Sequence, residues 1–235
     1  MLPQTNHSTH KNRILAALPR ADLEQFFNEL APVSLSLKQI LYPVGAPLEH
    51  VYFIEQGIAS VLMSMADGAS IEVGMIGTEG IVGLPALLGG DISDQQIIVQ
   101  VSGTAQRMDA NSCRTAFDGS TAVRRAALRF TEGLLALSGQ TAACNRLHST
   151  EQRFARWLLM ARTRLESDDI PMTHEFLSTM LGVRRTGVTE VATKLRRAGL
   201  IRYHHGEITI LDREALEATA CECHQIDRRR LLRLL

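Results

Sequence analysis

The stretch LGVRRTGVTEVATKLRRAGLIRYHHGEITI, Leu181 to Ile210, joins a helical apolar period, a dense group of cations and a short strand pair. Just before it, Thr173 can cap a helix that Gly182 closes, because a Thr hydroxyl satisfies a free helix N–H and Gly tolerates the left-handed cap. A second apolar pattern then runs from Val183 to Leu195. Two helices joined by a Gly-containing turn are typical of a helix-turn-helix.

Two strand signals follow the second helix directly. Gly199 ends the helix, a strand covers residues 201–203, a turn falls at His205 and Gly206, and a second strand covers residues 208–211. This order predicts the wing of a winged helix-turn-helix. The alternative is a solvated, charged helix packed on a hairpin, which would need neither the Gly turn nor the separation of polar and apolar faces.

The polar side chains of the predicted second helix lie off its apolar stripe, on the face that would enter the major groove. Those expected to read base edges are Arg184, Arg185, Thr186, Thr189 and Glu190. The residues expected to contact phosphates lie at the end of this helix, at the cap of the first helix and in the wing turn, and they are Thr173, Lys194, Arg196, Arg197 and His205. Because DNA is densely negative and cations release its counterions, we expect double-stranded DNA as the partner.

Composition alone would not predict this partner. The 235-residue chain is 45% apolar and has a formal net charge of zero, which argues against a wholly basic nucleic-acid protein. Between Met172 and His205, however, six cations accompany two carboxylates, which gives this segment a local charge of about +4. No apolar run is long enough to span a bilayer and the N-terminus resembles no signal peptide, so we expect a cytoplasmic protein without membrane contact.

The four cysteines are Cys113, Cys144, Cys221 and Cys223. Their spacing contains no C-x-x-C pair and is not that of a disulfide framework, so we interpret them as reduced thiols. Cys221, Cys223 and His224 could supply part of a zinc or iron site, but the sequence shows no partner pair to complete four ligands. We therefore expect no metal and no cofactor.

The segments upstream of the helix-turn-helix complete an α+β fold. Residues 12–30 show the pattern of a short helical pair interrupted by Pro19. From Val33, brief apolar runs broken by Gly and Pro predict many short strands, as in a sandwich or barrel. The expected organisation is a sensor barrel at 1–120, a dimerisation helix at 121–148 and a winged helix-turn-helix domain at 149–235, whose first helix begins at a capping box in residues 149–152.

One seam of the helix at 121–148 recurs at alternating steps of four and three. Its members are Val123, Ala127, Phe130, Leu134, Leu137, Thr141 and Cys144. The seam could simply cover the barrel. We favour a contact with the same helix of a second subunit, because so regular a seam is more than one barrel face requires.

The order of these segments resembles the Crp/Fnr family of bacterial transcription regulators, over about residues 12–223. The motifs that carry the resemblance are YPVGAPLEHVYFIEQGIASV with Gly45 and Gly57, and the pattern that leads to GLI at 199–201. The resemblance implies a cyclic-nucleotide-binding-like jelly roll, a homodimer on a palindromic operator, and RNA polymerase as a partner. Aligned on Val188, Arg185 keeps the family's guanine-reading Arg.

Other positions depart from the family pattern. Thr186 replaces the family's base-reading Glu, and Glu190 falls where the cyclic-AMP receptor has a further Arg, so the operator should differ from the usual consensus. In the sensor, the aligned ligand-pocket positions are Gly83, Leu84, Gln95 and Gln96. Leu84 replaces the ribose-binding Glu and the two glutamines replace the phosphate-binding Arg-Ser pair, so we do not expect cyclic AMP to bind.

Other sensors and enzyme activity find little support in the sequence. The first cysteine is Cys113, whereas the family's oxygen sensors hold iron-sulfur clusters with N-terminal cysteines, and single His residues such as His50 or His148 are weak haem candidates. An unidentified small-molecule effector stays open. We find no catalytic motif and expect no enzyme. The alternative function is a regulatory barrel whose winged helix docks protein rather than DNA.

Overall fold

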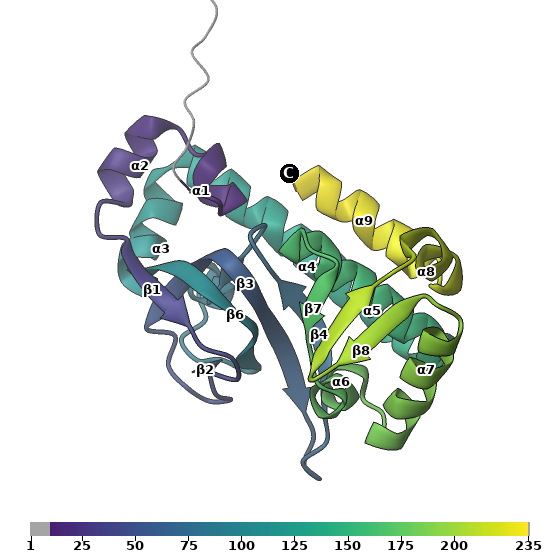
Figure 1. Cartoon of the computed structure of the whole chain (residues 1–235). Helices are drawn as coiled ribbons and strands as arrows, with labels where there is room; N and C mark the ends of the chain where they lie inside the picture. The colour runs from purple at the N-terminus through teal and green to yellow at the C-terminus, as the bar shows by residue number, and fades with distance from the viewer. Residues whose placement is uncertain (1–9, 235) are drawn as a thin grey trace, which may run out of the picture.

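Two short helices precede the sheet in the computed structural model, which describes residues 10–234 (Figure 1). Asn12 caps α1 (Arg13–Ala17), because its side-chain oxygen accepts from the N–H groups of Ile14 and Leu15. Pro19 then starts α2 (Arg20–Phe26). The helical pair expected at the N-terminus is therefore present.

The domain expected to be a sensor, called the sensor below, is built on an antiparallel sheet in the order β1-β6-β3-β4, with β2 paired to β6 and β5 paired to β3. The strands are β1 (Ala31–Leu35), β2 (Ile40–Tyr42), β3 (His50–Ser64), β4 (Ser70–Ile76), β5 (Ile81–Val82) and β6 (Gln96–Asp109). The prediction that all strands are short was wrong, because β3 and β6 each continue through glycines taken as breaks.

Gly57 and Gly103 let the two long strands approach and bend instead of ending them. A Cβ on Gly57 would lie 2.5 Å from the carbonyl oxygen of Val101, and one on Gly103 only 1.9 Å from that of Gln56. Gly57 also has φ +90°, and the register between β3 and β6 shifts near this point. Bulges of this kind curve a sheet without breaking its pairing.

Helices close one side of the sheet. After the 3₁₀ helix η1 (Leu84–Leu88) and β6 come α3 (Ala110–Gly119) and the long α4 (Thr121–Leu147), which Ser120 caps. Leu15, Phe53 and Ile54, all fully buried or nearly so, lie in the sensor core, to which α4 contributes Phe130.

Most of the predicted seam of α4 is buried within the chain. Val123, Ala127 and Phe130 lie in the sensor core and Leu134 packs against Gly74 of β4, whereas Leu137 lies in the second core and Cys144 among the other cysteines. These side chains are therefore already covered within one chain, as the alternative interpretation had it, which leaves little of the seam for the contact with a second subunit that we favoured. A regular apolar period identifies a buried face but does not say which partner buries it.

The C-terminal part begins with α5 (Thr150–Leu165), whose capping box of Ser149 and Gln152 forms as predicted. Next are β7 (Asp169–Pro171), α6 (His174–Leu181), α7 (Arg185–Arg197), β8 (Ile201–His204), β9 (Glu207–Ile210), α8 (Arg213–Thr219) and α9 (Cys223–Leu234). β9 lies between β7 and β8. α9 returns to pack along α4 and α5 (Figure 1). Among the described residues, no helix is both long and apolar enough to cross a membrane.

Candidate nucleic-acid interface

The helix-turn-helix has the caps that its sequence predicts. The Thr173 hydroxyl accepts from the N–H of Phe176 at 3.2 Å and starts α6, and Gly182, at φ +60°, ends it. Val188, Ala192 and Leu195 of α7 are buried against the domain core. The opposite face of α7 is left to solvent, where a second helix of this motif meets DNA.

The residues expected to read bases are all exposed, on the first two turns of α7 and its cap, and they are Arg184, Arg185, Thr186, Thr189 and Glu190. Within residues 10–234, no carboxylate lies at ion-pair distance from Arg184 or Arg185, so both guanidinium groups are available to a ligand. The Thr189 hydroxyl, in contrast, already has partners within the protein. Its hydroxyl donates to the carbonyl of Arg185 at 3.0 Å and lies 3.2 Å from Nδ1 of His174.

The residues expected to contact phosphates differ in their availability. Arg196 and Arg197 are exposed and make no ion pair with any described residue. Lys194 instead lies 2.5 Å from the Glu151 carboxylate of α5. Lys194 would have to leave this exposed pair, which contributes little to stability, before it could bind a phosphate.

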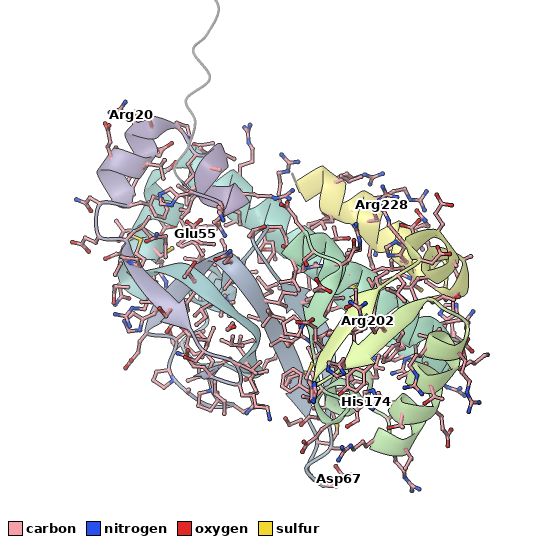
Figure 2. The ribbon with its side chains drawn as sticks, in the orientation of Figure 1. Arg20, Glu55, Asp67, His174, Arg202 and Arg228 are labelled. Carbon is pink, nitrogen blue, oxygen red and sulfur yellow. The ribbon has the colours of Figure 1, made fainter. Side chains whose placement is uncertain are left out.

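His174 joins α6 to the wing, a role that the sequence did not reveal. Its ring stacks on Tyr203 of β8, with centroids 4.1 Å apart and planes 20° apart. Burial, together with the nearby charge of Arg185, lowers the pKa of His174, which favours the neutral ring. His174 and Arg202, a neighbour of Tyr203 on β8, are both labelled in Figure 2.

The wing turn has the backbone that its sequence requires. His205 and Gly206 both have positive φ, at 47° and 81°. The N–H of Met172 donates to the carbonyl of Gly206 at 2.7 Å, which brings the turn beside Thr173. The first cap and the wing turn, both expected at phosphates, therefore lie next to each other.

The ligand-pocket positions of the sensor offer few polar groups. Gly83 adopts φ +89°, and its Cα lies so close to His50 that a Cβ would meet the His50 carbonyl at 2.7 Å. Leu84 is buried in the sensor core, while Gln95 and Gln96 are half-buried at the start of β6. The structure thus places an apolar side chain at the position where the family's ribose-binding Glu aligns.

A buried polar network links the sheet to α5. Glu72 of β4 accepts hydrogen bonds from Ser60 at 2.7 Å, from Gln100 at 3.2 Å and from the indole N–H of Trp157 in α5 at 3.1 Å. Burial raises the pKa of Glu72 to about 7, although the hydrogen bonds and nearby arginines oppose the shift. A second link is the buried ion pair between Glu79 and Arg164, at 2.7 Å.

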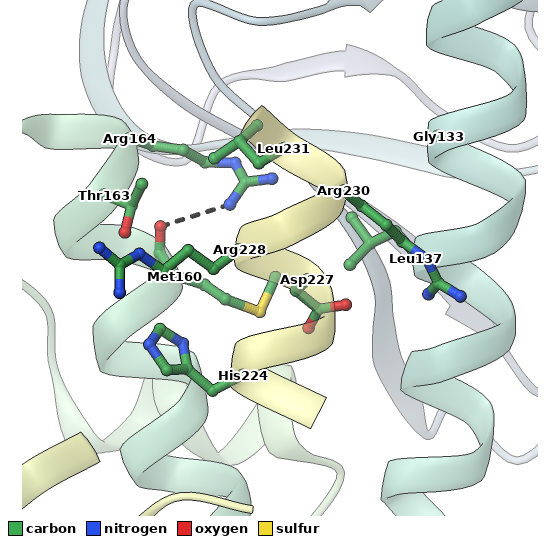
Figure 3. A pocket seen from close by; sticks show the side chains of 10 residues that line it. All are labelled: Gly133, Leu137, Met160, Thr163, Arg164, His224, Asp227, Arg228, Arg230 and Leu231. Atoms are coloured by element: carbon green, nitrogen blue, oxygen red, sulfur yellow. Dashed lines mark hydrogen bonds between the residues drawn. The ribbon is translucent and has the colours of Figure 1, made fainter. Parts of the chain in front are cut away.

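The C-terminal helix fixes α5 against α4. Arg156 of α5 pairs with Asp227 of α9 at 2.7 Å, and both side chains are buried. Beside this pair lies an apolar pocket between α4, α5 and α9, into which His224 extends from α9 (Figure 3). Neither ring nitrogen of His224 has a hydrogen-bond partner among the described residues, and burial lowers its pKa. His224 is therefore a core residue, apart from the thiols that precede it in sequence.

Three of the cysteines and one histidine lie close together, although the sequence predicted separate roles for them. Cys221 and Cys223 lie against Cys144 of α4 and His148, the C-cap of that helix, with one ligand atom from each of the four within 4.8 Å of the others. Cys144 was expected in a dimer seam. Only the return of α8 and α9 to α4 brings these residues together, and no spacing in the sequence reports that return.

Comparisons with known proteins agree with this architecture. A model of the cyclic nucleotide-binding domain matches residues 32–119, and a model of the Crp-like helix-turn-helix domain matches residues 152–219. No curated protein matches the sequence. FixK2 from Bradyrhizobium japonicum is a similar solved structure, with a TM-score of 0.71 at 18% identity over 82% of this chain and 98% of its own.

Two further solved structures share the fold. A putative Crp/Fnr-family regulator from Eubacterium rectale has a TM-score of 0.69 at 16% identity, over 89% of this chain and 98% of its own. A CRP-family regulator from Thermus thermophilus has a TM-score of 0.68 at 20% identity, over 80% and 96%. Since the two domain models together match more than half of the chain, in the order that this fold combines them, the chain belongs to the Crp/Fnr family of transcription regulators.

Proposed function

We propose that the protein is a sequence-specific transcription regulator that binds a palindromic operator as a homodimer and is not controlled by cyclic AMP. The observation that carries the proposal is the start of α7, where Arg184 and Arg185 project without an ion-pair partner among the described residues. A paired arginine would have to break its contact before reading a base, whereas these can form the bidentate contact to guanine directly.

The proposed dimer uses the face of α4 opposite the predicted seam. Leu128 and Leu135 are 47% and 70% exposed, and they stand seven residues apart. Gly139 and Ala142 continue this face and are exposed as well, and Gly139 has no atom within 4 Å of where its Cβ would be. Apolar and small residues at heptad spacing suit a close pairing of two α4 helices. Two-fold pairing would present two α7 helices to half-sites about one helical turn apart.

Independence of cyclic AMP is supported by the sensor pocket. Leu84 offers no oxygen for a ribose hydroxyl, and Gln95 and Gln96 offer amides in place of a cation. A buried phosphate without a compensating charge is costly. Another small molecule could still be the effector, and RNA polymerase is the partner that a regulator of this family would contact.

The test compares Arg185→Ala with Arg197→Ala on the protein's selected operator and on random duplex. Arg185→Ala should cost roughly 1 to 3 kcal/mol on the operator and leave random-DNA affinity nearly unchanged. Arg197→Ala, at a phosphate, should weaken both alike. Arg20→Ala, at an exposed position of α2, serves as the control and should change neither.

Equal loss on both duplexes for Arg185→Ala would overturn the base-reading assignment. A wild-type protein that binds neither duplex, with or without cell extract as a source of effector, would favour the alternative in which the winged helix docks protein. Protein docking of that kind would lack the steep salt dependence of DNA binding.

A further inference from the structure

A group of three cysteines and one histidine lies where the C-terminal helices meet α4. Cys144 lies in the last turn of α4, and His148, four residues on, is the C-cap whose backbone N–H donates to the Cys144 carbonyl. Cys221 and Cys223 come from the junction of α8 and α9. All four offer ligand atoms that lie within 4.8 Å of one another.

The three clustered thiols do not pack into either hydrophobic core. Cys144, Cys221 and Cys223 are at most 4% exposed and form a buried cluster of their own, separate from both domain cores. Cys113 shows the contrast, because it is fully buried among aliphatic residues of the sensor core. Burial raises the pKa of Cys113 to about 12, as expected for a thiol used as a small apolar side chain.

Two of the distances within the cluster match the edges of a tetrahedron around one ion. Sγ of Cys144 and Sγ of Cys221 are 3.6 Å apart, and Sγ of Cys223 is 3.7 Å from Nδ1 of His148. Zinc–sulfur bonds of about 2.3 Å and zinc–nitrogen bonds of about 2.1 Å at tetrahedral angles would give edges of about 3.8 Å and about 3.6 Å.

Neighbouring groups orient the cluster as they would around a metal. Nε2 of His148, the nitrogen that points away from the thiols, lies 3.3 Å from the Glu222 carboxylate. A carboxylate in this place fixes the tautomer that leaves Nδ1 free to bind an ion. The side-chain amide of Gln140 donates to Sγ of Cys223 at 3.1 Å, a contact that favours a thiolate.

A nearby cation lacks a compensating charge. Arg153 of α5 is 9% exposed, donates to the carbonyl of Leu181, and has no hydrogen-bond partner at Nε and no carboxylate among the described residues. It interacts electrostatically with Cys144 and Cys221. A divalent ion held by three thiolates and a neutral imidazole has a net charge of −1, which would compensate the charge of this buried arginine.

We propose that Cys144, His148, Cys221 and Cys223 bind one Zn²⁺ in a tetrahedral Cys₃His site that ties the C-terminal helices to the end of α4. Binding exchanges three thiol protons, released to solvent, for one ion, and no oxidation takes place. A single ion fits better than an iron-sulfur cluster, since a cluster inserts several iron and sulfide atoms between its ligands and holds them farther apart. Four filled positions leave no opening for water, so the site would be structural and not catalytic.

The experiment uses the full chain, reduced and stripped of metal, and titrates it with Zn²⁺ and separately with Co²⁺. We expect one equivalent to bind, Co²⁺ to give the visible bands of a tetrahedral site with thiolate charge-transfer bands, and Zn²⁺ to displace it. Cys221→Ser should lower Zn²⁺ affinity by more than about 100-fold, because it removes a ligand, whereas Cys113→Ser should leave it unchanged.

A variant at the surface tests the site even if Cys221→Ser prevents folding. Glu222→Gln changes an exposed side chain and should weaken Zn²⁺ binding by about 10- to 100-fold, because it removes the group that orients His148. Glu214→Gln, an exposed change on α8, should have no effect. Equal Zn²⁺ affinity of Cys221→Ser and Cys113→Ser, a cobalt spectrum without thiolate bands, or recovery of an iron-sulfur cluster would each overturn the proposal.

Discussion

Glutamine in place of Glu72 should abolish a titration that the wild-type protein reports through its only tryptophan. Trp157 donates its indole N–H to Oε1 of Glu72, so ionisation of that carboxyl changes the field at the indole ring. Because the pKa of Glu72 is raised to about 7, the fluorescence of Trp157 should titrate with a midpoint near that value. Glu72→Gln keeps an acceptor for the indole but cannot ionise.

The raised pKa of Glu72 also affects stability. A carboxyl whose pKa is 4.5 in the unfolded chain and about 7 in the folded protein binds its proton more tightly when folded. Its contribution to the free energy of unfolding is therefore full below about pH 4.5 and is lost as pH rises toward 7. The loss amounts to roughly 3 kcal/mol, because a tenfold difference in proton affinity corresponds to about 1.36 kcal/mol.

Denaturant unfolding of both proteins at about pH 5 and about pH 8 measures this loss. The stability of wild type relative to Glu72→Gln should fall by roughly 3 kcal/mol between the two conditions. Glu49→Gln, at an exposed position, is the control for changing the charge of the sensor. A Trp157 titration that persists in Glu72→Gln, or a stability difference that does not change with pH, would refute the reasoning.

Three further changes test other parts of the account. Leu135→Glu, on the exposed face of α4, should shift the dimer toward monomer in analytical ultracentrifugation, whereas Leu232→Glu on α9, also exposed, should not. An unchanged dimer in Leu135→Glu would exclude the exposed face of α4 as the dimer contact. Gly103→Ala should lower the free energy of unfolding by about 1 to 3 kcal/mol, since its Cβ would lie 1.9 Å from the Gln56 carbonyl oxygen. Gly187→Ala, which has open space at its Cβ, should not destabilise the protein, and equal effects of the two changes in denaturant unfolding would contradict the close approach. Arg164→Met should lower the free energy of unfolding by about 3 to 5 kcal/mol, because it leaves the Glu79 carboxylate buried without its partner. The double variant Arg164→Met/Glu79→Gln should recover much of this stability, and failure to recover it would mean that packing and not charge dominates.

The local features of the helix-turn-helix could be predicted because they depend on neighbouring residues. The Thr173 cap, the Gly182 turn and the box at Ser149 each satisfy helix-end groups within a few residues, so the sequence contains the whole interaction. The long strands β3 and β6 were missed because Gly57 and Gly103 permit close approach there, whereas a glycine elsewhere often marks a turn.

Contacts between distant segments could not be predicted in the same way. The apolar period of α4 identified a buried face, but not that Phe130 and Leu134 would pack on the chain's own sensor. Cys144 meets Cys221 across 77 positions, and Glu72 meets Trp157 across 85. Such pairs depend on how α4, α5 and α9 pack, which no local pattern specifies.

The most direct test of the central claim is selection of bound duplexes from a randomised pool by the purified protein without added ligand, followed by affinity measurement against salt. The account predicts a palindromic winner with half-sites about one helical turn apart, and an affinity that falls steeply as salt rises. Enrichment of no sequence, with binding that hardly changes between low and high salt even when effectors are supplied from cell extract, would contradict a DNA-reading role for α7.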